Sequence, residues 1–408
     1  MLKLKFIPSI LSTLFVVILF TSCTKKTEIW KFDAGETAKF QTNPTYSSSL
    51  NAVIFWSSYS ETGIGDQETY VIPKVKNPGS GIHLELDKKV FRAVLRAVDC
   101  VTGKEIWTSS VLGESDQNIS SPIIFDGLVY VGSDNGKLYA LDEKTGAVIW
   151  SYDTKSWVYS TPFADDMYIT CANENGFLYV FDRNNRTLLW KKSVGETDKS
   201  WIVANGIVYG IVLNSIMAFD VKKGTFIKKI EIADKYYDFN GLEQKNAPIV
   251  SELVIANGYA YCTALSHYLY KINIEKESLV WQTHLGKAGY STPVVTDEYI
   301  YIGTAVRDVL QVKNNTGAVV RRFSTDNKWL DYSLKLHRGG PINGTVAIDK
   351  STLYFGSYDY GFYAYDIPSG KRLWKYAIKH HIDRTTPIIT DTHVIFGADS
   401  HHLYALER

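Results

Sequence analysis

The sequence has few cysteines and no surplus of either charge, and both shortages argue against certain classes of protein. Four cysteines are spread over 408 residues, and Cys100, Cys171 and Cys262 lie far apart. Apart from Cys23 near the N-terminus, these three are an odd number of widely spaced cysteines, which does not indicate a disulfide framework, so we expect buried thiols. The 44 lysine and arginine residues nearly balance the 43 aspartate and glutamate residues. Nothing in this balance indicates nucleic acid as a partner.

Sustained helical spacing is also missing, and the one long apolar run lies close to the N-terminus. Lys3 and Lys5 precede an apolar stretch at 10–20, and Cys23 follows. The stretch is too short for a transmembrane helix and predicts an export leader. We therefore expect a signal peptide over 1–22 and a short tether over 23–28.

A cysteine directly after small residues at this point resembles the bacterial lipobox. The resemblance implies that Cys23 becomes the lipidated first residue of the mature protein, anchored in a membrane by its acyl chains. Thr24 after the cysteine favours sorting to the outer membrane, with the protein facing the periplasm, although the sequence does not settle which membrane or which side. A plain secretory leader with a chance cysteine is the alternative.

The rest of the chain repeats one short pattern eight times. An acidic or polar residue is followed by glycine at the fourth position and tryptophan at the eighth, as in Asp142, Gly146 and Trp150. A spacing of about 40 residues with several short strands per unit is typical of a β-propeller. The first positions of the eight copies are Asp99, Asp142, Asp182, Asp220, Asn273, Lys313, Asp366 and Glu407.

One repeat contains four short strands separated by tight turns. They are expected at 121–125, 128–133, 137–141 and 147–150, with glycine and asparagine in the turns. The last repeat ends before its fourth strand, and 27–32 has the form of the missing one. We predict an all-β fold, an eight-bladed propeller of four-stranded antiparallel blades over 29–408, with the last blade closed by the N-terminal strand.

The tryptophan of each repeat is expected to be structural. Asp142 can accept hydrogen bonds from turn amides, Gly146 can adopt the left-handed conformation, and Trp150 can bury its ring between blades while its indole N–H reaches a backbone partner. Lys228 and Arg321 replace the tryptophan in two repeats. The predicted docking residues are Trp30, Trp107, Trp150, Trp190, Trp281 and Trp374.

These repeats resemble the PQQ-like, quinoprotein-type propeller family. The resemblance is carried by Ser160-Thr161-Pro162, by Gly132-Ser133-Asp134-Asn135-Gly136 and by the docking pattern, and it covers nearly all of the chain after the leader. The family has a branch of quinone-dependent dehydrogenases and a non-catalytic branch of BamB-like lipoproteins. The repeat itself does not decide between them.

The dehydrogenase branch makes demands that this sequence does not meet. Its members typically place an adjacent Cys-Cys pair against the quinone, and no two cysteines are neighbours here. A Cys-x-x-Cys-His haem site is also missing. We therefore expect no enzyme activity and no bound cofactor.

Four histidines near the C-terminus are candidates for a metal site. His380 and His381 precede the first strand of the last repeat, and His401 and His402 occupy its second turn, on the same face. Histidine is a common zinc or copper ligand. Adjacent side chains on a strand point oppositely, however, and no cysteine or clear carboxylate completes the set, so solvated loop histidines are the favoured interpretation.

Three insertions into the repeat are the best candidates for a functional surface. They lie between Lys228 and Pro248, between Arg321 and Pro341, and at about 61–88, and the alternation of strands places all three on one face. Long loops in a compact domain are usually functional or disordered, and aromatic residues beside charge suit protein binding. These loops could instead plug the central channel. The predicted partner residues are Tyr236, Tyr237, Phe239, Trp329, Tyr332 and Arg338.

The function predicted from sequence is therefore that of a binding module. The BamB-like resemblance implies a lipid-anchored scaffold of the cell envelope whose protein partner belongs to the machinery that assembles outer-membrane β-barrels. Two alternatives stay open: a propeller that binds a carbohydrate or another small ligand at its loop face, and, disfavoured, a quinone-dependent dehydrogenase.

Overall fold

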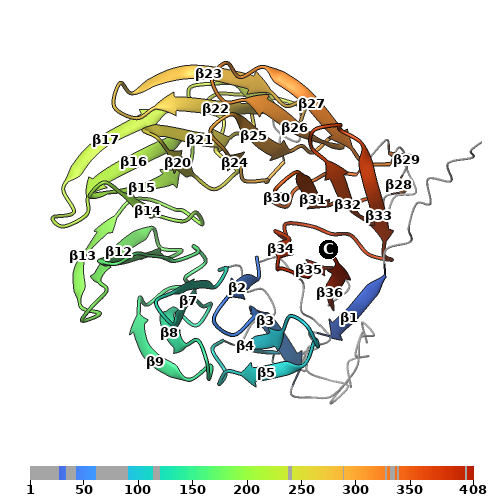
Figure 1. The fold of residues 1–408 in the computed structure, drawn as a ribbon. Helices are drawn as coiled ribbons and strands as arrows, with labels where there is room; N and C mark the ends of the chain where they lie inside the picture. Colours follow the sequence, from blue (N-terminus) through green and yellow to red (C-terminus); the bar gives the residue numbers. More distant parts are fainter. Residues whose placement is uncertain are drawn as a thin grey trace, which may run out of the picture.

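The chain forms a ring of eight four-stranded antiparallel sheets in the computed structural model (Figure 1). The structure describes residues 27–33, 43–60, 91–113, 120–237, 241–287, 289–326, 329–330, 336–337, 340–399 and 402–408. Every regular element within these ranges is a strand. The predicted all-β, eight-bladed propeller is confirmed.

Within each blade the first strand lies nearest the centre of the ring and the fourth lies on the rim (Figure 1). Blades one to four consist of β2 (Thr45–Ser47), β3 (Ala52–Ser60), β4 (Phe91–Asp99), β5 (Glu105–Thr108); β6 (Ile123–Phe125), β7 (Leu128–Gly132), β8 (Lys137–Asp142), β9 (Val148–Asp153); β10 (Phe163–Ala164), β11 (Tyr168–Ala172), β12 (Phe177–Asp182), β13 (Leu188–Ser193); and β14 (Ile202–Ala204), β15 (Ile207–Val212), β16 (Ser215–Asp220), β17 (Phe226–Glu231). Blades five to seven consist of β20 (Val254–Ala256), β21 (Tyr259–Thr263), β22 (Tyr268–Asn273), β23 (Ser278–His284); β24 (Val294–Val295), β25 (Tyr299–Gly303), β26 (Asp308–Lys313), β27 (Val319–Ser324); and β30 (Ala347–Asp349), β31 (Thr352–Gly356), β32 (Gly361–Asp366), β33 (Arg372–Ala377).

The eighth blade joins the two ends of the chain. It contains β34 (Ile388–Ile389), β35 (His393–Ala398) and β36 (His402–Glu407), and its rim strand is β1 (Glu28–Asp33). β1 runs antiparallel to β36, with Trp30 opposite Ala405, and Figure 1 shows the blue strand beside the red one. The predicted closure by the N-terminal strand is confirmed.

Neighbouring blades are joined on the rim by the repeated tryptophan. The indole Nε1 of Trp107 donates a hydrogen bond of 3.0 Å to the carbonyl of Glu143, which follows Asp142 in the next blade. The ring is 7% exposed, so the contact is shielded from water. The equivalent bonds run from Trp30 to Cys100 (2.9 Å), from Trp190 to Val221 (2.8 Å) and from Trp281 to Asn314 (3.1 Å).

The turn under each tryptophan is built to receive it. The Asp142 carboxylate accepts the backbone N–H groups of Lys144 and Thr145, at 3.1 and 2.8 Å. Gly146 has a φ of 70°, and a Cβ atom there would overlap the ring of Trp107. Glycine is therefore required both by the left-handed backbone and by the close approach of the indole.

The prediction of glycine at the fourth position after the acidic or polar residue is wrong for two repeats. Arg186 and Glu277 occupy that position, and both adopt the left-handed conformation without being glycine, with φ of 58° and 51°. Lys228, which replaces the tryptophan facing Glu277, pairs with its carboxylate at 3.0 Å. The Lys228 ammonium also donates to the carbonyl of Ile274 at 2.9 Å. This carbonyl is equivalent to the one that accepts an indole N–H at the four junctions above, so the junction keeps its hydrogen bond.

The core lies between adjacent blades. The cluster between blades two and three, for example, contains Tyr130, Leu138, Ile169 and Phe181, all fully buried. Cys100, Cys171 and Cys262 are buried as free thiols. Burial raises the pKa of Cys262 to about 12, so this thiol is protonated and inert at neutral pH.

We expect Trp107 substitutions to separate the packing of the docking residue from its hydrogen bond. Trp107→Phe keeps a ring but leaves the Glu143 carbonyl without its donor, and it should lower the free energy of unfolding by about 1–2 kcal/mol. Trp107→Ala also leaves a cavity and should cost about 3–5 kcal/mol. Urea titration measures both values. Trp157→Ala, at a tryptophan that is 47% exposed, is the control and should lie within about 0.5 kcal/mol of wild type. Equal losses in Trp107→Ala and the control would contradict the docking role.

Candidate functional site

One face of the disc carries the connections that depart from the repeat. In an antiparallel blade, the turn between the second and third strands and the connection to the next blade emerge on the same side. We call this side the insertion face. Two of its connections form hairpins of their own: β18 (Tyr236–Tyr237) pairs with β19 (Glu243–Gln244), and β28 (Trp329–Leu330) pairs with β29 (Leu336–His337).

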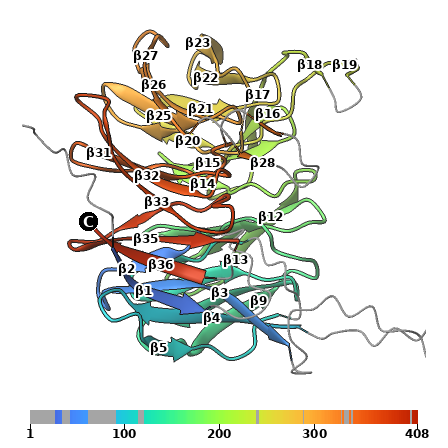
Figure 2. The ribbon, with the colours of Figure 1, turned by 90° about the vertical axis from the view of Figure 1, so that its right-hand side faces the viewer.

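The β18–β19 hairpin projects from this face near the rim of the disc, away from its centre (Figure 2). Tyr236 packs against the core between blades four and five, while Tyr237 is 68% exposed. Lys235 and Glu243 close the hairpin with an ion pair of 2.7 Å. At its base, the Tyr270 hydroxyl donates to the Asp234 carboxylate at 2.6 Å. The hairpin is thus fixed at its base, and it does not plug the axis.

Only some of the residues predicted to contact a partner lie in the described part of the structure. Tyr236 and Tyr237 lie on β18, and Trp329 begins β28 as the backbone partner of His337. The insertion at 61–88 lies outside the described residues, as does the predicted lipidation site Cys23. The same holds for Phe239, Tyr332 and Arg338.

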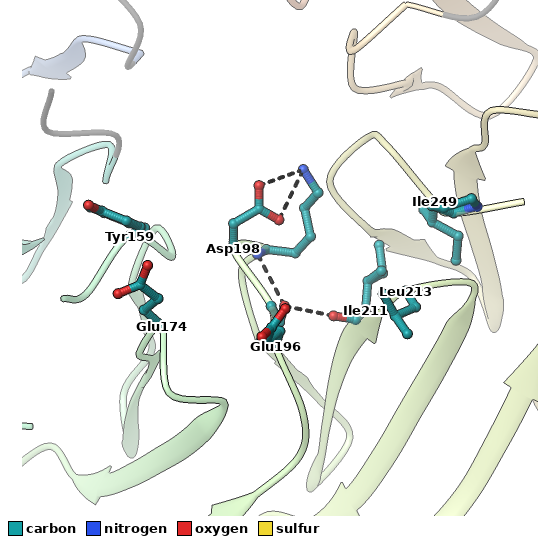
Figure 3. Close-up of a pocket in the computed structure, with 10 residues that line it drawn as sticks. Tyr159, Glu174, Glu196, Asp198, Ile211, Leu213 and Ile249 are labelled. Atoms are coloured by element: carbon teal, nitrogen blue, oxygen red, sulfur yellow. Dashed lines mark hydrogen bonds and ion pairs between the residues drawn. The ribbon is translucent and has the colours of Figure 1, made fainter. Parts of the chain in front are cut away.

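Beside the first hairpin the insertion face is hollowed into a cavity of about 450 Å³, which we call the cup (Figure 3). Tyr159 and Glu174 lie on one side of it, and Leu213 and Ile249 lie on the other. The cup is lined by Tyr159, Glu174, Glu196, Thr197, Asp198, Lys199, Ile211, Leu213, Pro248 and Ile249. Most of these residues come from turns and connections between blades two and five, with Ile211 on β15, and none was predicted from the sequence as a binding residue.

The cup combines an acidic side with an apolar side. Glu174, Glu196 and Asp198 are exposed, and among the described lining residues only Lys199 is basic, with its ammonium 3.5 Å from the Asp198 carboxylate. The Thr197 hydroxyl fixes the acidic loop by donating to the Ile211 carbonyl at 2.7 Å (Figure 3). Three carboxylates against one ammonium leave an acidic excess beside aliphatic side chains. Such a surface suits a partner that presents basic and apolar groups.

Leu213 at the edge of the cup has an unusual backbone. It lies in the two-residue turn between Val212 and Ser215, with a φ of 52°, and it is 67% exposed. Turns of this kind usually place glycine or asparagine where φ is positive. A large apolar side chain in that position, directed to solvent, is typical of a binding surface rather than of a turn optimised for stability.

A second feature lies at the axis, where one polar residue from each blade faces the centre. The backbone N–H of each residue donates to the side chain of the next blade at several junctions: Asn43 to Ser121 (2.9 Å), Ser121 to Thr161 (3.2 Å), Ser200 to Glu252 (2.9 Å), Thr292 to Thr345 (3.4 Å) and Thr386 to Asn43 (2.8 Å). We call these eight residues the axial belt. They precede buried residues, most often proline, which explains the Ser160-Thr161-Pro162 motif in the sequence.

The axial belt surrounds a smaller cavity of about 150 Å³, the neck, which shares Tyr159, Asp198 and Lys199 with the cup. Glu252 lies in its wall. Desolvation raises the pKa of the Glu252 carboxyl, and the nearby Lys199 ammonium opposes that shift. Burial likewise raises the pKa of Tyr159 to about 12, so its phenol is neutral at physiological pH.

The histidines do not form the solvated set that the sequence suggested. His381 is 7% exposed and stacks against Tyr358 and Tyr360, with ring centroids 4.6 and 4.7 Å away. Its Nδ1 lies 2.6 Å from the carbonyl of Tyr358. The solvated interpretation is therefore wrong for His381, because two tyrosine rings enclose it. His380 is exposed, His402 is half-buried, and His401 lies outside the described residues.

Across the described part of the chain, no group of three or more histidine, cysteine, aspartate or glutamate side chains is arranged to hold a metal ion. The same residues contain no helix that is long and apolar enough to cross a membrane.

Comparison with known proteins decides the family. The family model described as PQQ_2, outer membrane protein assembly factor BamB, matches residues 92–323 and 331–408. The chain belongs to this family. The assembly factor BamB of Yersinia pestis is 23% identical over 267 residues, which cover 61% of the chain and 63% of that protein. The chain thus spans about three fifths of the length of this BamB relative.

Two further proteins resemble the chain, one in sequence and one in structure. The quinoprotein alcohol dehydrogenase PedH of Pseudomonas putida is 30% identical, but over only 89 residues, 22% of the chain and 15% of that enzyme. The crystal structure of BamB from Moraxella catarrhalis superposes with a TM-score of 0.63 at 11% identity, covering 94% of the chain and all of that protein. The structural likeness shows the fold alone.

We expect the stability of Glu252→Gln to depend on pH in a defined way. A carboxyl whose pKa is raised on folding costs stability when it is ionised at neutral pH, and this cost disappears once the pH falls below the ordinary glutamate pKa of about 4.3. The amide keeps an oxygen that can accept the Ser200 N–H. The variant should therefore melt at a higher temperature than wild type at pH 7, and the difference should close near pH 4. Thermal unfolding across this range measures it, with exposed Glu196→Gln as the control; a variant less stable than wild type at pH 7 would refute the assignment.

Proposed function

We propose that the protein is a non-catalytic scaffold of the bacterial cell envelope that assists the assembly of outer-membrane proteins. The family match and the BamB relative support this role. The single observation that carries it is the insertion face, where exposed Leu213 borders the acidic cup and exposed Tyr237 and Leu242 belong to the connection that forms the β18–β19 hairpin. Large apolar side chains exposed next to uncompensated charge are typical of a surface that a protein partner covers.

The same proposal includes the way in which the propeller is held. Residues 1–22 act as a signal peptide, and Cys23 carries the lipid anchor at the periplasmic side of the outer membrane. With a tether over 23–28, the propeller that begins at 29 stays close to the bilayer. The positive N-terminal region, the apolar stretch at 10–20 and the small residues before Cys23 support this arrangement.

The strained turn at Leu213 offers a test in which stability and binding move in opposite directions. Leu213→Gly relieves a left-handed backbone that costs about 1–2 kcal/mol, and part of that gain is offset by the entropy of glycine. The variant should be more stable than wild type by about 0.5–1 kcal/mol in urea titration. It should nevertheless recover less partner, because the exposed apolar side chain is gone. A variant that gains stability and keeps full binding would remove Leu213 from the interface.

The partner itself is best sought by crosslinking in membranes that contain the full-length protein. Wild type should recover components of the barrel-assembly machinery, and the double variant Tyr237→Ala, Leu242→Asp should recover at least fivefold less. Leu373→Asp, at an exposed leucine on rim strand β33, is the matched control and should behave as wild type. Equal recovery by all three proteins would move the contact away from the insertion face. Absence of assembly components from the wild-type sample would refute the assembly role.

A further inference from the structure

The neck at the axis has the composition of a ligand site rather than of a packed core. Among the described residues that line it, Val250 alone is aliphatic. Belt hydroxyls of Ser121, Thr161 and Thr345 accept a backbone N–H from the preceding blade, as the distances above show. A hydroxyl that accepts such a bond still has its own proton to donate. These three hydroxyls therefore offer O–H donors beside the axis.

The formal charges around the neck cancel. Lys199 and Arg384 contribute two positive charges, and Asp198 and Glu252 contribute two negative charges. An anion in the neck would meet both carboxylates, and a cation would meet both basic groups, so either would bring like charges together. A neutral ligand with many hydroxyl groups avoids this conflict, because each hydroxyl can donate to a carboxylate and accept from a guanidinium or ammonium group.

An aromatic face lies beside these polar groups. Tyr290 lines the neck and is 47% exposed, and the Arg384 guanidinium lies 4.2 Å from the centre of its ring. Arg384 reaches this place with a φ of 35°, a left-handed conformation that is uncommon for arginine. Strained residues of this kind cluster at binding sites, where the surrounding structure holds them.

A ligand larger than the neck can extend from it into the adjoining cup. Its residues Tyr159, Asp198 and Lys199 also line the cup, so the two cavities adjoin. The neck, at about 150 Å³, is narrow, whereas the cup, at about 450 Å³, has a size typical of small-molecule sites. A chain of linked units can place one end in the neck and the next unit in the cup.

From this geometry we infer that the neck binds one unit of a neutral carbohydrate, a pyranose, and that the cup receives the next unit of the same chain. The face of the Tyr290 ring that Arg384 does not cover packs against the sugar ring, and Arg384, Glu252 and the belt hydroxyls bind its hydroxyl groups. The cup also belongs to the surface proposed for the protein partner, so the two ligands would compete there. The sugar assay uses purified protein without that partner, so either proposal can fail without the other.

The test measures binding of defined sugars to the purified full-length protein by isothermal titration calorimetry. The probes are glucose, N-acetylglucosamine, maltose and N,N′-diacetylchitobiose, with phosphate as the anion and spermidine as the cation. Tyr290→Ala removes the aromatic face. Arg384→Asn removes the guanidinium with a residue that tolerates a positive φ. Lys235→Ala, on the hairpin outside the neck, is the matched control, and thermal unfolding establishes that every variant is folded.

Saturable binding of at least one sugar, tightened in its disaccharide form, is the expected result. It should weaken at least tenfold in both neck variants and stay unchanged in the control. Sugar binding that survives both neck substitutions would overturn the location. Binding of phosphate or spermidine in place of sugars would overturn the ligand class, and no binding of any sugar would overturn the inference as a whole.

Discussion

The ring depends on a hydrogen bond from one blade to the next, which the structure shows at five of its junctions. A tryptophan on the rim strand donates to a turn carbonyl of the next blade, and the glycine under it lets the indole approach closely. Where tryptophan is absent at position 228, a lysine ammonium donates to the equivalent carbonyl. The contact survives a change of residue type because its essential part is a buried donor at a fixed place, since an unpaired buried carbonyl is costly. Repeats held by such neighbour contacts tolerate variation within each unit.

The axial belt complements the rim contacts at the centre of the disc. On the rim, a side chain donates to a backbone carbonyl; at the axis, a backbone N–H donates to a side chain. Hydrogen bonds thus hold neighbouring blades together both at the rim and at the axis. This leaves the connections on the insertion face free to vary in length and sequence, as loops on a rigid scaffold commonly do. The hairpin at Tyr236 and Tyr237 and the strained turn at Leu213 both use that freedom.

The sequence allowed the blade count, the strand order and the closing strand to be predicted, because each follows from a local pattern repeated at a constant spacing. The cup could not be predicted: Glu174, Glu196 and Leu213 come from three different turns, and only the curvature of the ring brings them together. The axial belt was partly visible as the Ser160-Thr161-Pro162 motif, yet Ser200 and Glu252 break that motif and were missed. The burial of His381 could not be predicted, because the tyrosines that enclose it precede it by more than twenty residues and meet it only in the folded blade.

The eighth blade has a consequence for the order of events during synthesis. β1 is made before almost every other strand, yet β36, its pairing partner, is among the last segments to leave the ribosome. In the interval, one edge of β1 has no strand to pair with, and Trp30 lacks the blade of Cys100 until the first blade is complete. An unpaired strand edge readily finds a wrong partner. The topology that seals the finished ring therefore gives the nascent chain its longest period of exposure, and the polar side chains of Glu28, Lys31 and Asp33 on that strand help to keep it soluble until the ring closes.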